Sequence, residues 1–209
     1  MRILIGVIIV GFIMLAGVLS YQGYQQALTG GDDPLTTSYQ FEKPRPIIDF
    51  VLTNQDDAPF TAKHLLGQWS LIFVGYTSCP DICPTTMAKL SSMYEQLNAI
   101  APVQIIFLSV DPARDSIRKL QDYRNFFHPK IVAVTGEHAK LYPLTQSLGM
   151  VYAMTGTGAD YQVDHSASLV LINPQGERVA VFKTMANTQG QGDMSSAQII
   201  HDFRLLTKS

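Results

Sequence analysis

Two nearly continuous apolar runs constrain the fold of this chain more than any other feature. They are Trp69 to Tyr76 (WSLIFVGY) and Val103 to Val110 (VQIIFLSV). Runs of this length without polar alternation are typical of strands that are buried on both faces, as in a sheet covered by helices. Between them, Thr85 to Ile100 carries apolar residues at helical spacing. We therefore expect a strand–helix–strand unit at the centre of an α/β domain.

The remaining residues predict further elements around this unit. A short strand at residues 47–52 comes first, and the turn Asn173-Pro-Gln-Gly176 joins the last two strands into a hairpin, which makes the sheet mixed. The other predicted helices are residues 116–127, 137–148 and 195–206, and the other predicted strands are residues 131–134, 168–172 and 178–183.

A cysteine pair between a buried strand and the following helix is typical of thioredoxin-like proteins. We expect residues 47–209 to form a thioredoxin-like domain, with a mixed sheet flanked by helices. Residues 47–66 and 128–158 would be additions to that core.

The N-terminal residues differ in character from the rest. An uncharged apolar run from Ile3 to Leu19 follows Arg2 and approaches the ~20 residues that cross a membrane. We expect residues 1–21 to be a transmembrane anchor. A cleaved signal peptide is the alternative, which the length of the run and the lack of a clear cleavage site disfavour. Residues 22–46 are polar, contain Gly30-Gly31, and are predicted to be a linker.

The basic residues near this run predict its orientation. Arg2 precedes the run, and the next basic residue is Lys43. The positive-inside rule then places the N-terminus in the cytoplasm and the domain outside. In a bacterium, the chain would be a single-pass inner-membrane protein with its domain in the oxidising periplasm.

Charge and cysteine content exclude several functions. The formal charge of -2 leaves no basic excess, so we expect no nucleic-acid partner. Both cysteines lie in the segment Cys79-Pro-Asp-Ile-Cys83. A disulfide between them would close a tiny loop and remove little unfolded-state entropy, so a structural staple is a poor explanation. Inert buried cysteines are a second alternative, which a polar loop between prolines disfavours.

The position and spacing of the pair favour redox chemistry or metal binding. A helix N-terminus stabilises thiolate, which is both the nucleophile and the metal ligand. Thioredoxin-type redox enzymes have two residues between their cysteines, whereas three lie between Cys79 and Cys83. If the segment is helical at Cys83, both sulfurs lie on one face and can bind one ion. A redox-active Cys79–Cys83 disulfide stays open as an alternative.

One of the five histidines is placed to complete a metal site. His165 precedes the predicted strand at residues 168–172, and in a thioredoxin-like fold the loop before that strand faces the cysteine turn. Two thiolates and one imidazole form a soft set suited to Cu(I), and able to hold Cu(II) with added ligands, while structural zinc usually has a fourth protein ligand. Asp164 either orients the imidazole or is a turn residue. The other histidines are expected to be surface or capping residues: His64, His128, His138 and His201.

Three motifs resemble the SCO/SenC family of copper-binding proteins. They are Val74-Gly-Tyr-Thr-Ser-Cys-Pro-Asp-Ile-Cys-Pro84, Val110-Asp-Pro-Ala-Arg-Asp115 and Tyr161-Gln-Val-Asp-His-Ser166. The resemblance implies a membrane-anchored domain that binds copper through Cys79, Cys83 and His165. It also implies a role in assembling the binuclear copper centre of cytochrome c oxidase, with the copper-receiving subunit as partner. Residues 184–194 match the family pattern poorly.

The sequence therefore leaves three candidate functions. The leading one is a copper metallochaperone, so the sequence favours a metal carrier over an enzyme without deciding between them. The second is a thiol-disulfide oxidoreductase that reduces the copper-site cysteines of a partner, and the third is a peroxidase of the peroxiredoxin type. Asp111, Arg114 and Asp115 are predicted to form a turn and helix cap, with a polar network beneath the site as the alternative. The methionines are predicted to be core or loop residues.

Overall fold

The computed structural model describes residues 14–21, 34–156, 158, 161–183, 185–186, 192–193 and 195–208. The chain forms two units, residues 1–34 and residues 35–209. In the first unit, residues 14–21 are helical, and the rest of the predicted anchor lies outside the described residues. Residues 22–33 of the predicted linker also lie outside them. Among the described residues, no helix combines the length and the apolar character that membrane crossing requires.

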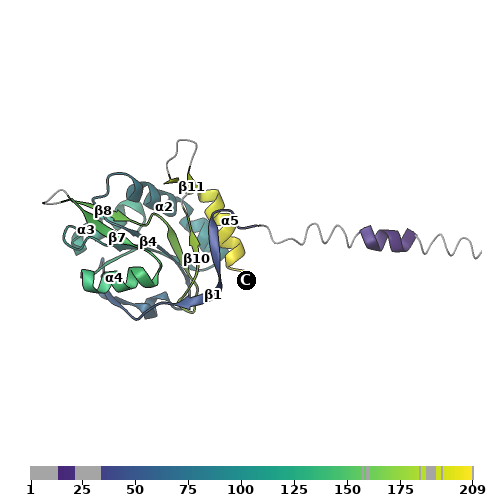
Figure 1. Ribbon diagram of the computed structural model, residues 1–209, viewed down its shortest axis with the longest axis horizontal. Helices are drawn as coiled ribbons and strands as arrows, with labels where there is room; N and C mark the ends of the chain where they lie inside the picture. Colours follow the sequence, from purple (N-terminus) through teal and green to yellow (C-terminus); the bar gives the residue numbers. More distant parts are fainter. Residues whose placement is uncertain are drawn as a thin grey trace, which may run out of the picture. The chain divides into compact units, whose positions relative to one another are not determined.

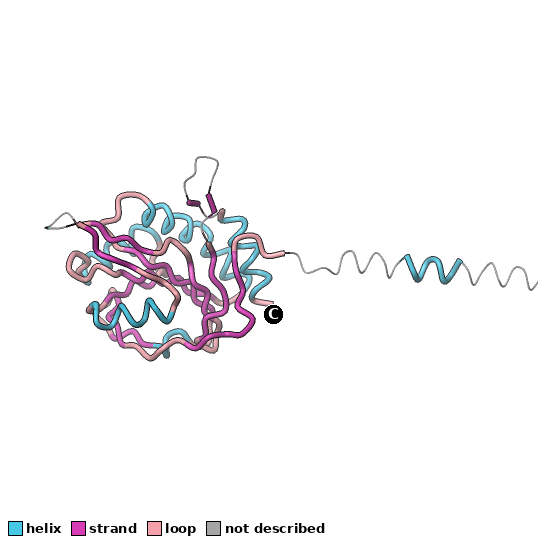
Figure 2. The backbone as a smooth tube through the Cα atoms, viewed as in Figure 1, coloured by secondary structure: helices cyan, strands magenta, loops and turns pink. Residues whose placement is uncertain are grey.

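The second unit is built on an eight-stranded mixed sheet (Figures 1 and 2). Its strand order is β1-β10-β9-β4-β5-β6-β2-β3. The strands are β1 Ser38–Pro46, β2 Val51–Asn54, β3 Pro59–Thr61, β4 Trp69–Gly75, β5 Val103–Ser109, β6 Val132–Thr135, β9 Leu169–Ile172 and β10 Glu177–Phe182. Strands β4, β5 and β6 are parallel, and the other pairs are antiparallel.

Helices surround the strands at the centre of this sheet (Figure 1). They are α2 Ile82–Ile100, α3 Ile117–Phe127, α4 His138–Ser147 and α5 Ser196–Leu206, with a short 3-10 helix η1 at Ala62–Leu65. All of β5, and all of β4 after Trp69, is buried. The prediction that these two apolar runs are covered on both faces is therefore confirmed, as is the mixed α/β fold.

Two pairs of short strands lie outside the main sheet. β7 Tyr152–Thr155 pairs with β8 Gln162–His165, and β11 Met185–Ala186 pairs with β12 Gly192–Asp193. The sequence predicted neither hairpin. Most residues of β7 are exposed, and β8 alternates over only four residues, so the periodic signal is too short to predict a strand.

The linker prediction is wrong for residues 38–46, which form strand β1. Residues 38–46 belong to the sheet, where Ser38, Tyr39 and Gln40 pair with β10. β1 is an edge strand, most of its residues are exposed, and a bulge interrupts its register between Gln40 and Arg45. Because neither face is fully buried, the strand lacks the apolar alternation by which a sequence indicates a strand.

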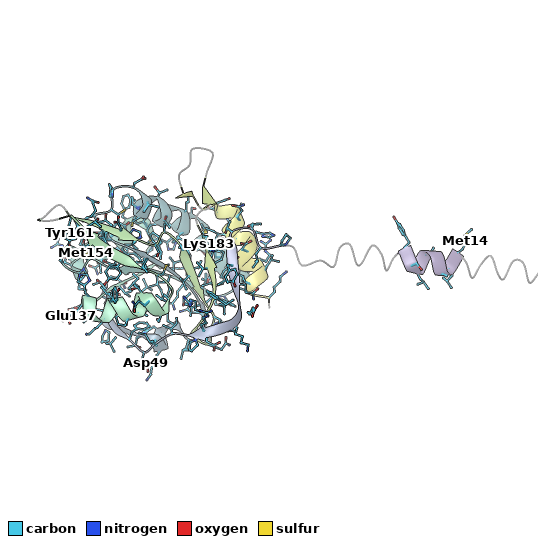
Figure 3. The ribbon with its side chains drawn as sticks, in the orientation of Figure 1. Met14, Asp49, Glu137, Met154, Tyr161 and Lys183 are labelled. Atoms are coloured by element: carbon cyan, nitrogen blue, oxygen red, sulfur yellow. The ribbon has the colours of Figure 1, made fainter. Side chains whose placement is uncertain are left out.

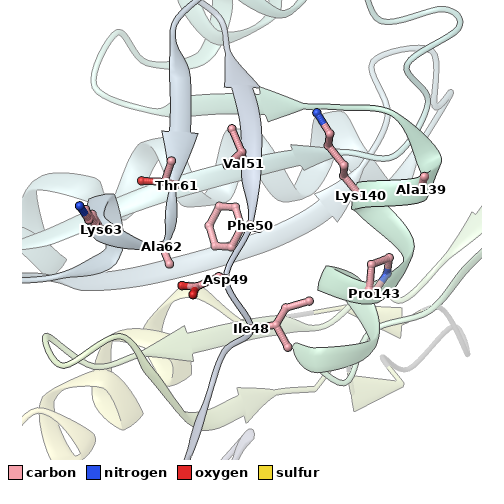
Figure 4. A pocket seen from close by; sticks show the side chains of 10 residues that line it. All are labelled: Ile48, Asp49, Phe50, Val51, Thr61, Ala62, Lys63, Ala139, Lys140 and Pro143. Atoms are coloured by element: carbon pink, nitrogen blue, oxygen red, sulfur yellow. The ribbon is translucent and has the colours of Figure 1, made fainter.

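A cavity of about 640 Å³ lies where β2 diverges from β6. β2 pairs with β6 only at Thr53 and Asn54, so the chain before these residues diverges from β6. Ile48 and Pro143 face each other across the opening (Figure 4). The cavity is lined by Ile48, Asp49, Phe50, Val51, Thr61, Ala62, Lys63, Ala139, Lys140 and Pro143.

The start of β1 is fastened to α5 by one buried carboxylate. Asp202 is completely buried and accepts hydrogen bonds from the backbone N–H groups of Thr36 (2.9 Å), Thr37 (2.8 Å) and Ser38 (2.8 Å). The hydroxyls of Thr36 and Ser38 donate to it as well. Burial alone would raise the pKa of Asp202, but the hydrogen bonds from His201 and these three residues lower it far below its ordinary value.

We expect Asp202→Asn to lower the free energy of unfolding by about 2–4 kcal/mol, because an amide cannot accept all of these bonds. Since the folded pKa is depressed, the contribution of Asp202 is present above the unfolded pKa of about 4 and is lost as the pH falls below it. Denaturant unfolding between pH 3 and 7 would show a shallower acid decline for the variant than for the wild type. Asp122→Asn, on an exposed face of α3, is the control and should change stability by less than about 0.5 kcal/mol. Equal effects of the two substitutions would contradict the assignment.

Candidate metal centre

The two cysteines lie where β4 passes into α2. The strand ends at Gly75, and α2 begins at Ile82, three residues earlier than predicted. Cys83 is therefore in the first turn of the helix, while Cys79 is in the preceding loop. Pro84 is compatible with this first turn, since the backbone N–H that it lacks has no helical partner there. Neither cysteine forms a disulfide; Cys83 is buried and Cys79 is half-buried.

His165 reaches the cysteines through the register of two central strands. β9 runs antiparallel to β4, with Leu169 opposite Phe73, so the start of β9 lies at the end of β4. His165 ends β8, just before β9. Its Nε2 atom lies 3.2 Å from Sγ of Cys83. Ligand atoms of Cys79, Cys83 and His165 all lie within 4.8 Å of one another, the one such cluster of potential metal ligands among the described residues.

The orientation of the imidazole leaves Nε2 free to bind. Nδ1 lies 3.2 Å from the carbonyl oxygen of Ser166. A carbonyl only accepts, so this contact assigns the ring proton to Nδ1 and leaves a lone pair on Nε2. The rings of Phe73 and Tyr76 lie edge-on to the imidazole, at 5.9 and 6.0 Å between centroids.

The structure does not support Asp164 as the group that orients His165. Asp164 is exposed, and neighbouring residues of a strand point to opposite faces, so its carboxylate projects away from the imidazole. The partner of Nδ1 is a main-chain carbonyl instead. Such a partner carries no residue signature, which is why the sequence could not predict it.

The two thiols have opposite acidities. The hydrogen bond from Cys83 is the main cause that lowers the pKa of Cys79 to about 4; burial opposes it, and the backbone N–H groups of Asp81 and Cys83 support it. The same hydrogen bond, followed by burial, raises the pKa of Cys83. At neutral pH the apo site therefore contains a Cys79 thiolate and a Cys83 thiol.

Gly75 provides the space for the buried sulfur. A Cβ atom at this position would lie 2.8 Å from Sγ of Cys83 and 2.9 Å from the ring of Phe107. Neither neighbour can move away easily, because both are completely buried. The glycine at the end of β4 therefore fixes where Cys83 can sit.

A polar network beneath the cysteine loop was not the favoured sequence interpretation. Asp115 is buried and accepts from the backbone N–H (2.9 Å) and hydroxyl (2.6 Å) of Thr77 and from the hydroxyl of Ser109 (2.6 Å). Lys119 donates to the hydroxyl of Ser78 at 2.8 Å. The network therefore holds the residues that lead into Cys79.

The N-cap of α3 is Ser116, so neither Asp111 nor Asp115 is the predicted helix cap.

Arg114 connects the same network to the hairpin that carries His165. Its guanidinium bonds Asp111, donates to the carbonyl of Tyr161 at 2.9 Å and stacks 3.8 Å over the Tyr161 ring. The hydroxyl of Tyr76 also donates to Gln162, at 3.1 Å. Tyr161 and Met154 lie at this hairpin (Figure 3).

The remaining histidines and methionines lie elsewhere or serve packing. His64 caps η1, His128 contacts the ring of Tyr94, His138 bonds Tyr152, and His201 bonds Asp202. Three methionines are core residues: Met87, Met93 and Met150. Met154 is exposed, and Met194 lies outside the described residues.

Comparison with known proteins identifies the family. The sequence profile of SCO1/SenC matches residues 40–198. The chain belongs to the SCO1/SenC family. It is 37% identical over 141 residues to an SCO2-like protein of Rickettsia felis, covering 64% of this chain and 67% of the relative. It is 34% identical over 129 residues to the mitochondrial SCO1 homolog 1 of Arabidopsis thaliana, covering 60% of this chain but only 39% of that protein.

Solved SCO structures have the same thioredoxin-like fold. The crystal structure of Arabidopsis thaliana ScoI with copper bound has a TM-score of 0.69 and 28% identity, covering 78% of this chain and 99% of that one. The SCO fold accounts for the strand and helix order of residues 35–209. The expectation of a thioredoxin-like SCO/SenC protein is confirmed.

The thiol acidities predict a selective reaction with alkylating agents. In the reduced protein we expect iodoacetamide to modify Cys79 and spare the buried Cys83, at a rate nearly constant between pH 6 and 8, because Cys79 is already ionised there. Cys83→Ala removes the main hydrogen-bond donor, so the rate should rise with pH across this window.

Cys83→Ser is the matched control, since its hydroxyl can still donate and the rate should stay nearly flat. Mass spectrometry of the modified peptide measures both site and rate. Steep, equal pH dependence in all three proteins would refute the proposed hydrogen bond.

Proposed function

We propose that this SCO1/SenC protein binds copper through Cys79, Cys83 and His165. The convergence of two sulfurs and one imidazole nitrogen within 4.8 Å is the observation that carries the proposal. These are soft ligands, which select Cu(I) over magnesium, calcium or manganese. One sulfur is already a thiolate, and Nε2 of His165 has a free lone pair, so loading requires the loss of one proton, from Cys83.

Copper is the cargo of the proposed function. The site would pass it to the copper-receiving subunit of cytochrome c oxidase, in which a binuclear centre is assembled, or to another copper or thiol protein. Support comes from the family and from the copper-bound Arabidopsis structure. The exposed side of Cys79 suits transfer, because an incoming thiolate can reach copper there while buried Cys83 still holds it.

The proposal includes a membrane location. An anchor at residues 1–21, with the N-terminus in the cytoplasm and the domain in the periplasm, rests on the apolar run from Ile3 to Leu19 and on the position of Arg2. Tethering would keep the copper site close to a membrane-embedded oxidase, which raises the effective concentration of each partner for the other.

Removal of the histidine tests the metal site. We expect the reduced protein to bind one Cu(I), and His165→Ala to lower the affinity by more than about 100-fold, since loss of a ligand exceeds the 10–100-fold effect of an outer-shell partner. Competition with a chromophoric Cu(I) chelator measures both values. His64→Ala, on exposed η1, is the control and should bind like the wild type. Tight binding by His165→Ala would remove this residue from the site, and no binding by the wild type would end the copper proposal.

Thiol-disulfide exchange is the second candidate function, and the opposite acidities of the two thiols favour it. The Cys79 thiolate would attack one sulfur of a partner disulfide and form a mixed disulfide, releasing a partner thiolate. Cys83 would then lose its proton and attack Cys79, which leaves an oxidised Cys79–Cys83 pair and a reduced partner. A peroxidase is less well supported, because Arg114 is engaged by Asp111 and Tyr161.

An experiment in cells that lack the protein distinguishes copper delivery from disulfide reduction. We expect added copper to restore oxidase activity, because excess copper can replace a copper carrier but cannot reduce a disulfide. A Cys83→Ser variant, which cannot resolve a mixed disulfide, should then accumulate no covalent adduct with an oxidase subunit. The opposite result has two parts: added copper does not restore oxidase activity, and non-reducing gels show a trapped Cys79 adduct. Together they would assign the protein to thiol reduction.

A further inference from the structure

One buried arginine lacks a hydrogen-bond partner for its Nε atom, and it lies far from the cysteines in the sequence. The buried charged side chains of the described residues are Asp111, Asp115, Asp202 and Arg178. Each aspartate has two or more hydrogen-bond donors. Arg178 is only 7% exposed, and its Nε atom is buried with no hydrogen-bond partner in the described part of the chain. Burial of an unpaired charge is costly, and Arg178 differs in this respect from the three buried aspartates.

A second arginine lies directly beside the first. Arg45 of β1 is opposite Arg178 of β10 in the antiparallel register. Both guanidiniums lie over the ring of Phe41, at 5.0 Å for Arg45 and 4.8 Å for Arg178. Burial lowers the pKa of Arg178, and the charge of Arg45 lowers it further. The positively charged guanidinium groups of Arg45 and Arg178 therefore lie close to each other.

The contacts within the chain compensate only part of this cost. The Phe41 ring attracts both cations. Nη1 of Arg178 occupies the space beside Gly149, where a Cβ atom would lie only 2.1 Å away, just beyond the end of α4. The partial negative charge of a helix C-terminus favours a cation there. No carboxylate forms an ion pair with either arginine among the described residues; that of Glu177 accepts from Asn173 instead.

Further charged residues lie along the two strands. Glu42 and Lys43 are both exposed on the same edge strand, whereas Lys183 lies at the opposite end of the β1–β10 pair, 5.8 Å from the centroid of the Tyr39 ring. Lys183 is near the end of β10 (Figure 3). An anion that approaches this edge meets positive charge from two strands.

We propose that Arg45 and Arg178 form a binding site for a phosphate group at the β1–β10 edge of the sheet. Residues opposite each other on neighbouring strands are close enough for two guanidiniums to share one ligand. The planar guanidinium donates two parallel hydrogen bonds to phosphate oxygens, a fit that an ammonium cannot reproduce. The phosphate belongs either to a free ion or to a lipid headgroup, and the site is independent of copper.

Thermal unfolding of the full chain in a non-ionic detergent tests this site. Potassium phosphate at about ten times its dissociation constant should raise the midpoint by about 3–6 °C over chloride of equal ionic strength. Arg45→Gln should abolish most of this rise. Arg118→Gln, on an exposed face of α3, makes the same charge change and should retain it.

A second variant and a second ligand complete the test. Arg178→Met should raise the midpoint in phosphate-free buffer, because it removes an unpaired buried cation, and should not respond to phosphate. Dihexanoyl phosphatidylglycerol, compared with dihexanoyl phosphatidylcholine, supplies the lipid arm. A response to inorganic phosphate alone assigns the site to the free ion, and a response to phosphatidylglycerol assigns it to headgroups. No response to either, or equal responses in Arg45→Gln and Arg118→Gln, would overturn the proposal.

Discussion

Strand β9 runs antiparallel to β4 with Leu169 opposite Phe73, and the geometry of the candidate metal centre depends on this register. It brings the chain that precedes β9 to the point where β4 releases the cysteine loop, so that His165 meets Cys83 at 3.2 Å. A slip of one residue would turn every side chain of β9 to the opposite face and move the histidine away. Both strands are buried in the core, which makes such a slip very costly.

The residues around this point position the cysteine loop and set the protonation of its two sulfurs. Asp115 fixes Thr77 from below, Gly75 leaves room for the Cys83 sulfur, and Cys83 in turn stabilises the Cys79 thiolate. The same arrangement suits two activities, because a thiolate beside a buried thiol can hold a soft metal or attack a disulfide. The geometry is therefore compatible with both copper binding and thiol-disulfide exchange.

Much of this was predictable from the sequence, because long apolar runs and helical spacing depend on burial, which β4, β5 and α2 have in full. The three site residues followed from the position of the cysteines after a strand and of His165 before one. Three features did not follow. β1 is an exposed edge strand, β7 and β8 are too short to show a period, and the partner of His165 is a carbonyl of the main chain. The role of Asp115 was hidden for another reason: a turn or cap also explains an aspartate after a strand.

The proposed function requires that one copper ion bind to two sulfurs and one imidazole of this chain. X-ray absorption at the copper edge of the reduced, Cu(I)-loaded protein tests it most directly. We expect scattering from two sulfur atoms and one imidazole nitrogen, with the imidazole signal lost in His165→Ala and both sulfur atoms retained. A copper environment without imidazole in the wild type, or an unchanged imidazole signal in His165→Ala, would contradict it.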